Sequence, residues 1–258
     1  MAEKIGGSEE NFVKMMNDKA KELGMENTCF KNSHGIDEEG HYTTAKDIAI
    51  MSRELITKHP DILKYTSIWQ DTLRDGTFGL NSTNKLIRFY EGATGLKTGS
   101  TSKALFNLSG TATRNGTSFI AVVMKAPSSA VRLEEVKQLL DYGFANYEVK
   151  NICESGVITG SININKCVNE TFDVSIKDKV TILADKGAKV DTIEKISYNE
   201  NLTAPLSSGD EVGNIEIFNR ETNEKIGESK LVISKDAPKS DLLAYIKEAV
   251  RHYLIKKG

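Results

Sequence analysis

The chain has 258 residues, of which 39% are hydrophobic and 27% are charged, as in an ordinary globular protein. Its formal net charge of −2 gives no basic field that would favour nucleic acid as a partner. No run approaches the ~20 apolar residues of a membrane span, and the first seven residues contain no apolar core of a secretory signal. Three cysteines are too few for a disulfide framework or a zinc site. Cys153 and Cys167 could pair in an oxidising compartment, but unpaired thiols are favoured.

A helix is expected near the start of the chain, from Ser8 to Leu23. Ser8 can cap it, glutamates occupy its first turn, and Gly24 can end it. Its apolar residues fall on one broad face, which is typical of core packing. Turn-forming residues dominate the irregular stretch over residues 25–42, which contains His34 and His41.

A second helix and a pair of strands are expected next. The helix begins at Thr44, with Asp47 three residues on in a variant of the capping box, and it stops at His59-Pro60. Helix-start chemistry accounts for both Thr44 and Asp47, so neither is assigned to catalysis. Residues 68–82 have a strand-like pattern around a turn with glycine, and residues 81–91 are expected to form a loop.

Three consecutive antiparallel strands and a helix are predicted after this loop. The first strand carries Lys97, and the others are Leu105–Thr113 and Ser118–Lys125. Asn115-Gly116 joins the last two and is a strong signal for a two-residue hairpin. A helix opened by Ser128 or Ser129 and ending at about Tyr147 follows, and a helix packed on an antiparallel sheet is an α+β arrangement.

The second half of the chain is expected to be a small all-β domain, either a sandwich or a partly closed barrel. Gly, Asn and Asp separate its short β-rich runs, which are Val157–Asn163, Thr171–Ile176, Val180–Ala184, Val190–Ile196, Val212–Phe218 and Lys225–Val232. The tail, residues 237–258, is predicted to form an amphipathic helix capped by Ser240. This helix either packs on the β domain, links to an anchor, or lies on a membrane surface.

The triplet Lys97-Thr98-Gly99 suits one wall of an acyl-transfer site. A lysine presents a cation to a carboxylate or to a catalytic proton network, and a threonine hydroxyl can donate to a substrate carboxylate. Glycine removes a side chain, so that an acyl-peptide can lie close to the strand. Such K-T-G triplets accompany S-x-x-K and S-x-N motifs in penicillin-binding proteins and class A β-lactamases. Alone the triplet is a weak signal, because an ordinary surface strand can carry it by chance.

Other segments strengthen this signal by their order and spacing. They are Phe30 to Ile36, His41 to Arg53, Asn81 to Leu86, and Ala121 to Ser128 followed by Arg132. With them the chain, from about Ser8 onward, resembles the low-molecular-mass penicillin-binding proteins, the serine D-alanyl-D-alanine carboxypeptidases. The resemblance implies an α+β transpeptidase-like domain over residues 1–148, a C-terminal β domain over residues 149–236 and an amphipathic helix over residues 237–258.

The resemblance also implies a set of substrate-binding residues and no metal or cofactor. They are Lys97, Thr98, Gly99, Thr101, Arg132 and His41. Lys97 and Thr98 would clamp the terminal carboxylate, with Arg132 as a second cation whose fork matches it. Thr101 would lend a backbone N–H to the oxyanion. The alternatives are that Arg132 is a solvated charge at a helix start and that His41 is a structural loop histidine.

The nucleophile of such a site is missing. A match to S-x-x-K at Ser100 to Lys103 lies in the K-T-G strand, where residues three apart point to opposite faces, whereas the motif needs one face of a helix. Matches to S-x-N begin at Ser161 and Ser197, in the β domain. The resemblance therefore places the catalytic serine, its lysine and the S-x-N motif before Met1.

The sequence is thus interpreted as part of a serine D-alanyl-D-alanine carboxypeptidase without turnover of its own. The resemblance implies that the complete enzyme trims the terminal D-Ala of peptidoglycan stem peptides, binds β-lactam antibiotics, and works outside the cytoplasm at the cell membrane or wall. The alternatives are a non-catalytic binding module, which could partner a separately encoded N-terminal piece, and a serine β-lactamase. The long C-terminal β domain argues against the β-lactamase.

Overall fold

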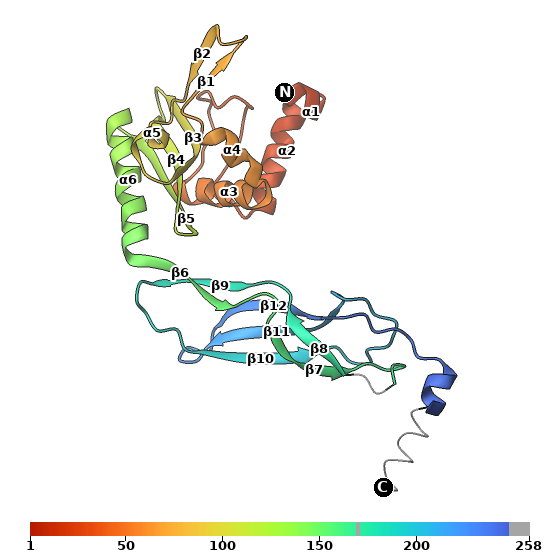
Figure 1. Ribbon diagram of the computed structural model, residues 1–258. Coiled ribbons are helices and arrows are strands. Elements are labelled where there is room, and N and C mark those ends of the chain that lie inside the picture. Colours follow the sequence, from red (N-terminus) through yellow and green to blue (C-terminus); the bar gives the residue numbers. More distant parts are fainter. Residues whose placement is uncertain (169–170, 248–258) are drawn as a thin grey trace. The chain divides into compact units, whose positions relative to one another are not determined.

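A computed structural model describes residues 1–168 and 171–247 (Figure 1). The chain divides into two compact units, Met1–Asn146 and Tyr147–Gly258. The first combines helices with antiparallel strands, and the second is built on antiparallel strands. This confirms the expected α+β class with a following β domain, whereas domain boundaries at residues 148 and 236 stay a prediction.

A three-stranded antiparallel sheet forms the centre of the first unit, in the order β3-β4-β5. The strands are β3 (Ala93–Thr101), β4 (Leu105–Arg114) and β5 (Thr117–Ala126). Asn115 and Gly116 join β4 to β5 with φ angles of 49° and 78°, as a two-residue hairpin requires. The predicted strands and hairpin are confirmed.

Helices cover both faces of this sheet. They include α3 (Ala45–Lys58) and α6 (Ser129–Asn146), and both pack on β4 and β5. Ser109 and Gly110 are neighbours on β4, so they face opposite ways. The Ser109 hydroxyl lies 2.8 Å from that of Ser52 on α3, whereas the Cα of Gly110 faces Val136 on α6. The sheet therefore lies between α3 and α6.

The α6 face carries the apolar core of this unit. Leu86, Leu108, Val136 and Leu140 are each at most 1% exposed there. Not every apolar residue of α6 is buried, because Leu139 is 49% exposed. Only some of the apolar residues of α6 therefore belong to its buried face.

The other helices of this unit are shorter or lie near the start of the chain. They are α1 (Ala2–Gly6), α2 (Glu9–Glu22), the 3₁₀ turn η1 (Pro60–Ile62), α4 (Leu63–Thr66) and α5 (Leu86–Phe89). The predicted caps of α2 and α3 are confirmed, because Ser8 Oγ accepts from Asn11 N at 3.2 Å and Thr44 Oγ1 accepts from Asp47 N at 3.2 Å. The stretch predicted as a loop contains α5, because burial of Leu86 stabilises one helical turn.

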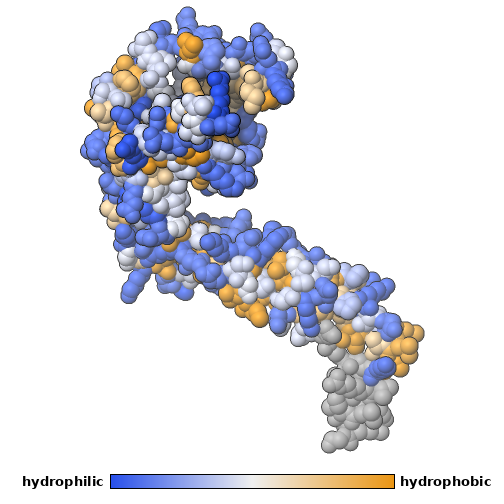
Figure 2. Space-filling model, turned by 45° about the horizontal axis from the view of Figure 1, so that its top comes forward, coloured by the Kyte–Doolittle hydropathy of each residue, from blue (hydrophilic) through white to orange (hydrophobic). Residues whose placement is uncertain are grey.

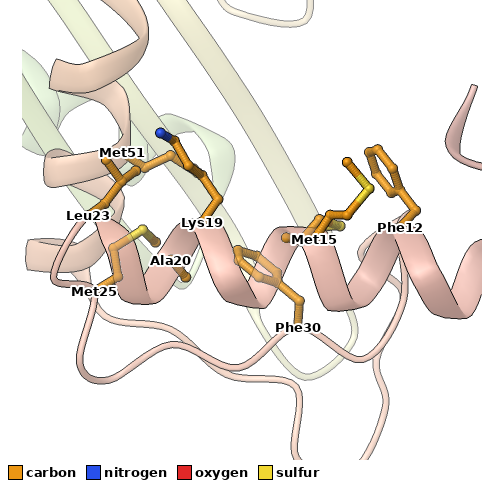
Figure 3. Close-up of a pocket in the computed structure, with 9 residues that line it drawn as sticks. Phe12, Met15, Lys19, Ala20, Leu23, Met25, Phe30 and Met51 are labelled. Carbon is orange, nitrogen blue, oxygen red and sulfur yellow. The ribbon is translucent and has the colours of Figure 1, made fainter. Parts of the chain in front are cut away.

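The apolar stripe of α2 is only partly covered. It lines a cavity of about 280 Å³ together with Phe30 from the following loop and Met51 from α3 (Figure 3). Ala20 is 3% exposed, but Met15 is 45% exposed. The expected core packing of this stripe is therefore confirmed at Ala20 and wrong at Met15.

A hairpin of β1 (Gln70–Leu73) and β2 (Phe78–Asn81) projects from the first unit (Figure 1). It confirms the strand-like pattern predicted over residues 68–82. Every residue of the two strands is exposed.

The second unit contains seven strands within the described residues. They are β6 (Tyr147–Cys153), β7 (Ile158–Asn163), β8 (Thr171–Ile176), β9 (Val180–Asp185), β10 (Thr192–Tyr198), β11 (Glu211–Asn219) and β12 (Lys225–Ile233). Five of them form one antiparallel sheet in the order β10-β11-β12-β8-β7, and β6 pairs with β9. The six predicted runs are confirmed, and β6 was missed because it follows α6 with no intervening turn residue.

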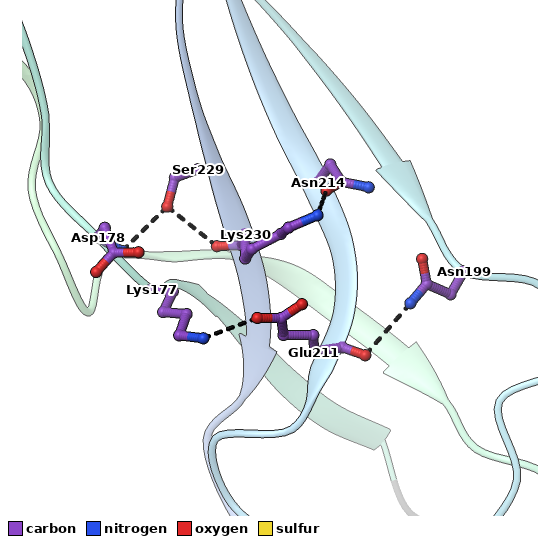
Figure 4. A network of polar contacts seen from close by, with 7 residues as sticks. All are labelled: Lys177, Asp178, Asn199, Glu211, Asn214, Ser229 and Lys230. Carbon is purple, nitrogen blue, oxygen red and sulfur yellow. Dashed lines mark hydrogen bonds and ion pairs between the residues drawn. The ribbon is translucent and has the colours of Figure 1, made fainter. Parts of the chain in front are cut away.

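Both apolar and polar contacts hold the second unit together. Phe172, Ile215 and Leu231 are fully buried in its core. On its surface, Lys177 Nζ pairs with Glu211 Oε1 at 2.7 Å, within a network that also joins residues 178, 199, 214, 229 and 230 (Figure 4).

No disulfide joins the cysteines of the second unit. The Cys153 thiol lies 3.8 Å from Glu194 Oε1, and the Cys167 thiol lies 2.9 Å from the carbonyl oxygen of Pro238. The two thiols thus make separate contacts, and the alternative of a bond between Cys153 and Cys167 is not formed.

The described part of the tail begins a helix at residues 242–247. Asp241 Oδ1 caps it by accepting from Ala244 N at 2.8 Å, whereas the predicted cap, Ser240, accepts from Val168 N. Leu242 and Leu243 are 75% and 65% exposed, and Figure 2 shows hydrophobic surface toward this end of the described chain. The rest of the predicted helix, residues 248–258, lies outside the described residues. Among the described helices, none has the length and apolar character to cross a membrane.

Candidate active site

The K-T-G triplet lies on β3, the edge strand of the three-stranded sheet. Lys97 is exposed, and its Nζ donates to the carbonyl oxygen of Thr98. None of the ion pairs of the described residues includes Lys97. Its cation is therefore available to an anionic ligand.

Adjacent side chains of the triplet point to opposite faces of the sheet. Lys97 pairs with Ser109 and so lies on the α3 face, whereas Thr98 pairs with Leu108 and lies on the α6 face. Thr98 is only 9% exposed, and its hydroxyl is 2.7 Å from that of Thr83. A ligand that contacts both side chains has to lie along the open edge of β3.

A cavity of about 420 Å³ lies between α3 and the sheet beside Lys97. The backbone of Gly99 also lines it, and a Cβ built on Gly99 would meet no atom within 4 Å. Among the described residues, no contact explains glycine at this position. Open space in front of Gly99 fits the expectation that a ligand lies against the strand here.

The candidate nucleophile at Ser100 has no lysine on the same helical face. Strand β3 ends at Thr101, and Lys103 lies in the turn that follows. The S-x-x-K match at this place is therefore a coincidence of sequence, as expected.

A further motif match was overlooked in the sequence. Ser82-Thr83-Asn84-Lys85 satisfies both S-x-x-K and S-x-N. Ser82 is not helical, and its Oγ accepts from Asn84 N at 3.2 Å, while Lys85 directly precedes α5. Ser82 and Lys85 thus do not share one helical face. The segment is nevertheless beside the triplet, through the contact of Thr83 with Thr98.

His41 lies near the end of β3 rather than beside Lys97. It lines a cavity of about 580 Å³ together with Lys103 and Lys125. Its ring meets Phe30 edge-on at 5.8 Å, and its Nδ1 is buried without a hydrogen-bond partner within the described residues. The two cavities share Asn107 as a lining residue.

Arg132 is buried in the first turn of α6. It is 6% exposed, and its Nη1 donates to the carbonyl oxygen of Asn107 at 3.2 Å. Burial lowers the pKa of its guanidinium from the usual value. The alternative of a solvated charge is therefore wrong. Its role as a second carboxylate clamp stays a prediction, and little of its surface is open to a ligand.

A loop carboxylate holds the turn that follows the triplet. Thr101 Oγ1 donates to Asp37 Oδ1 at 2.7 Å, and Ser102 Oγ and Lys103 N both lie 3.3 Å from Oδ2. These hydrogen bonds, that from Thr101 first, lower the pKa of Asp37. This contact could not be predicted from the sequence, because Asp37 is more than sixty residues away from these donors.

Two family models match the chain. Residues 1–128 match the family D-alanyl-D-alanine carboxypeptidase, peptidase S11, and residues 147–239 match the C-terminal domain of penicillin-binding protein 5. The chain belongs to the D-alanyl-D-alanine carboxypeptidase family. The resemblance to low-molecular-mass penicillin-binding proteins is thereby confirmed.

Individual relatives agree with this family. D-alanyl-D-alanine carboxypeptidase DacF of Bacillus subtilis is 37% identical over 254 residues, which are 97% of this chain and 64% of that protein. DacD of Escherichia coli is 32% identical over 90% of this chain and 62% of its own length. The chain therefore spans less than two thirds of the length of these curated relatives. Penicillin-binding protein 5 of Haemophilus influenzae has a similar structure, with a TM-score of 0.67, 29% identity, and coverage of 92% of this chain and 69% of that one.

Proposed function

We propose that this chain supplies the K-T-G wall of a serine D-alanyl-D-alanine carboxypeptidase. The observation that supports this most is Lys97, an exposed cation on an open strand edge, next to the free space in front of Gly99. The substrate would be a peptidoglycan stem peptide, whose terminal D-Ala carboxylate would bind along β3. A β-lactam antibiotic would occupy the same edge.

In the proposed reaction, a serine oxygen attacks the carbonyl carbon of the penultimate residue and gives up its proton to a base. The terminal D-Ala leaves with a proton, and water then hydrolyses the acyl-enzyme. Lys97 and Thr98 would hold the carboxylate. The oxyanion, where the charge develops, would need N–H donors on the open edge of β3, whereas Thr101, the donor predicted from the sequence, pairs with Leu105 on β4. His41 would line the neighbouring cavity.

The serine and its lysine would come from outside these 258 residues. Neither Ser82 nor Ser100 has a lysine one helical turn away on the same face. The chain by itself is therefore expected to bind without turnover. The same observation favours a second candidate function, a non-catalytic module that binds the same ligands.

The proposed site of action is outside the cytoplasm, at the membrane or cell wall. The hydrophobic patch over Leu242, Leu243 and Ile246, each more than half exposed, supports contact of the tail with a membrane surface. This location also rests on the family of the chain.

A fusion protein tests the proposed function. The part of Bacillus subtilis DacF that precedes the matched region would be joined to Met1, and the fusion would be incubated with a fluorescent penicillin. We expect covalent labelling, and strong loss of labelling in Lys97→Ala. Lys64→Ala removes an exposed lysine on α4 and serves as the control. A folded fusion that takes up no label would contradict the proposed function.

A further inference from the structure

Thr83 brings a second hydroxyl to the threonine of the K-T-G triplet. Its Oγ1 lies 2.7 Å from Thr98 Oγ1, although the two residues are 15 positions apart in the sequence. Within the described residues, neither hydroxyl has a further hydrogen bond. Thr98 is only 9% exposed, whereas Thr83 lies at the surface. The pair therefore joins the loop before α5 to the strand edge at which the ligand is proposed to bind.

The loop that carries Thr83 is fixed on both sides. Before it, Ser82 N donates to the carbonyl oxygen of Trp69 at 2.9 Å, next to the start of β1. After it, Asn84 is 4% exposed, and its Oδ1 accepts from Leu86 N at 3.1 Å at the start of α5. Leu86 is itself fully buried in the core. The Thr83 hydroxyl thus reaches β3 from an ordered segment.

The direction of the Thr98 O–H bond decides whether this hydroxyl can bind an anion. A threonine hydroxyl has one proton to donate and can accept two hydrogen bonds. If Thr98 donates to Thr83, its proton is used within the chain and cannot meet a ligand. If Thr83 donates to Thr98, the Thr98 proton is free for a carboxylate oxygen, and the two hydrogen bonds in series strengthen each other.

We propose that Thr83 is a positioning residue, which donates to Thr98 and so turns the Thr98 proton toward the carboxylate of the ligand. This inference rests on the proposed function, in which Thr98 holds the terminal carboxylate. Thr83 does not meet the carboxylate itself and acts through Thr98. Residues 82–85 lack the helical geometry of an S-x-x-K motif, so their part in the site is to hold Thr83 against β3.

The decisive substitution is Thr83→Val, which keeps the shape of the side chain and removes its proton donor. Thr83→Ser restores a hydroxyl. Thr94→Val is the matched control, because Thr94 on β3 forms a similar half-buried pair with Thr111, with 2.8 Å between the hydroxyl oxygens. None of these substitutions changes the charge of the chain, and only Thr83→Val removes the contact with Thr98.

The first measurement is urea unfolding of this chain, which does not depend on any activity. Thr83→Val, Thr98→Val and the double variant form a double-mutant cycle. We expect the midpoint of the double variant to lie above the value obtained by adding the two single shifts, because both single variants lose the same hydrogen bond. Additive shifts would show that the two hydroxyls are not coupled and would overturn the proposal.

The second measurement is the concentration dependence of penicillin labelling of the DacF fusion. Thr83→Val is expected to raise the concentration that gives the half-maximal rate about 2–10-fold, the size of one neutral hydrogen bond, with little change in the limiting rate. Thr83→Ser and Thr94→Val should behave like the unsubstituted fusion. An unchanged half-maximal concentration in Thr83→Val, or no rescue by Thr83→Ser, would overturn the proposal.

The route through Thr98 is tested in the same assay. In a fusion with Thr98→Val, the further substitution Thr83→Val is expected to change the half-maximal concentration by less than about twofold, because no Thr98 proton is left to be turned. A full additional effect would show that Thr83 acts on its own and would overturn its role as a positioning residue. Failure of the unsubstituted fusion to label would instead overturn the proposed function and, with it, the role of Thr83 in binding.

Discussion

The two faces of the β3–β5 sheet differ in how they are filled. On the α6 face, Leu86, Leu108 and Val136 are at most 1% exposed. On the α3 face, a hydroxyl pair between Ser52 and Ser109 spans the interface, beside a cavity of about 420 Å³. The packed face fixes the strands, and the open face leaves the Lys97 cation unpaired. One sheet thus serves as a scaffold on one side and as a candidate site on the other.

The largest expected difference between the faces is in the stability that is lost when a leucine is shortened to alanine. Leu140→Ala, on the packed face, should lower the free energy of unfolding by about 2–5 kcal/mol, because Leu140 is fully buried. Leu55→Ala is the matched substitution on α3, where the leucine is 37% exposed and lines the cavity. It should cost about 1 kcal/mol. Urea unfolding followed by the fluorescence of Trp69, the single tryptophan, measures both. Equal losses would mean that the faces are packed alike.

Adding a methyl group should also affect stability differently on the two faces. A Cβ on Gly110 would lie 2.6 Å from Val136 Cγ1, so Gly110→Ala is expected to cost about 1–3 kcal/mol of stability. Gly99→Ala meets no atom and should change stability by less than about 0.5 kcal/mol. The same unfolding experiment tests the pair, and penicillin labelling of the DacF fusion should fall in Gly99→Ala. Normal labelling in that variant would argue against a ligand at this strand edge.

A smaller effect is expected at the hydroxyl pair between α3 and β4. Ser52→Ala leaves the buried Ser109 hydroxyl without its partner and should cost about 1 kcal/mol. The double variant Ser52→Ala with Ser109→Ala should be less destabilised than the sum of the single variants, since no partner is left unsatisfied. Additive losses of stability would indicate that the two hydroxyls are not coupled.

The smallest effect is expected in the pH dependence of stability at Asp47. This residue of α3 accepts hydrogen bonds from the loop residues Asn27 and Thr28. The hydrogen bond from Thr28, followed by that from Asn27, lowers the pKa of Asp47 in the folded state below its unfolded value of about 3.9. Its contribution to stability is therefore complete above that pH and is lost as the pH falls through the lower, folded pKa. Urea midpoints of the wild type and Asp47→Asn should differ at pH 7 and converge at acidic pH. A difference that stays constant down to pH 2 would contradict this assignment.

Local signals in the sequence were sufficient for most of the fold. Ser8 and Thr44 mark helix starts, Asn115-Gly116 marks a hairpin, and short β-rich runs separated by Gly, Asn and Asp mark the strands of the second unit. Two elements were missed for physical reasons. Strand β6 follows α6 with no turn residue between them, and α5 is a single turn that depends on tertiary burial of Leu86.

The sequence predicts the motifs of the candidate site but not the contacts between distant residues around them. The K-T-G triplet and its place on an edge strand were readable from the sequence, as was the match at Ser82 to Lys85, which was overlooked. The burial of Arg132 and the contact of Asp37 with Thr101 were not readable. They depend on which distant segments meet in the folded chain, and no spacing in the sequence encodes that.

Intact-mass spectrometry of this chain alone, after incubation with a penicillin, tests the central claim most directly. We expect an unchanged mass, because neither Ser82 nor Ser100, the serines of the two S-x-x-K matches, has a lysine one helical turn away on the same face. A stoichiometric adduct would contradict the account. It would mean that a serine of this chain is activated, and peptide mapping should then begin with Ser82 and Ser100.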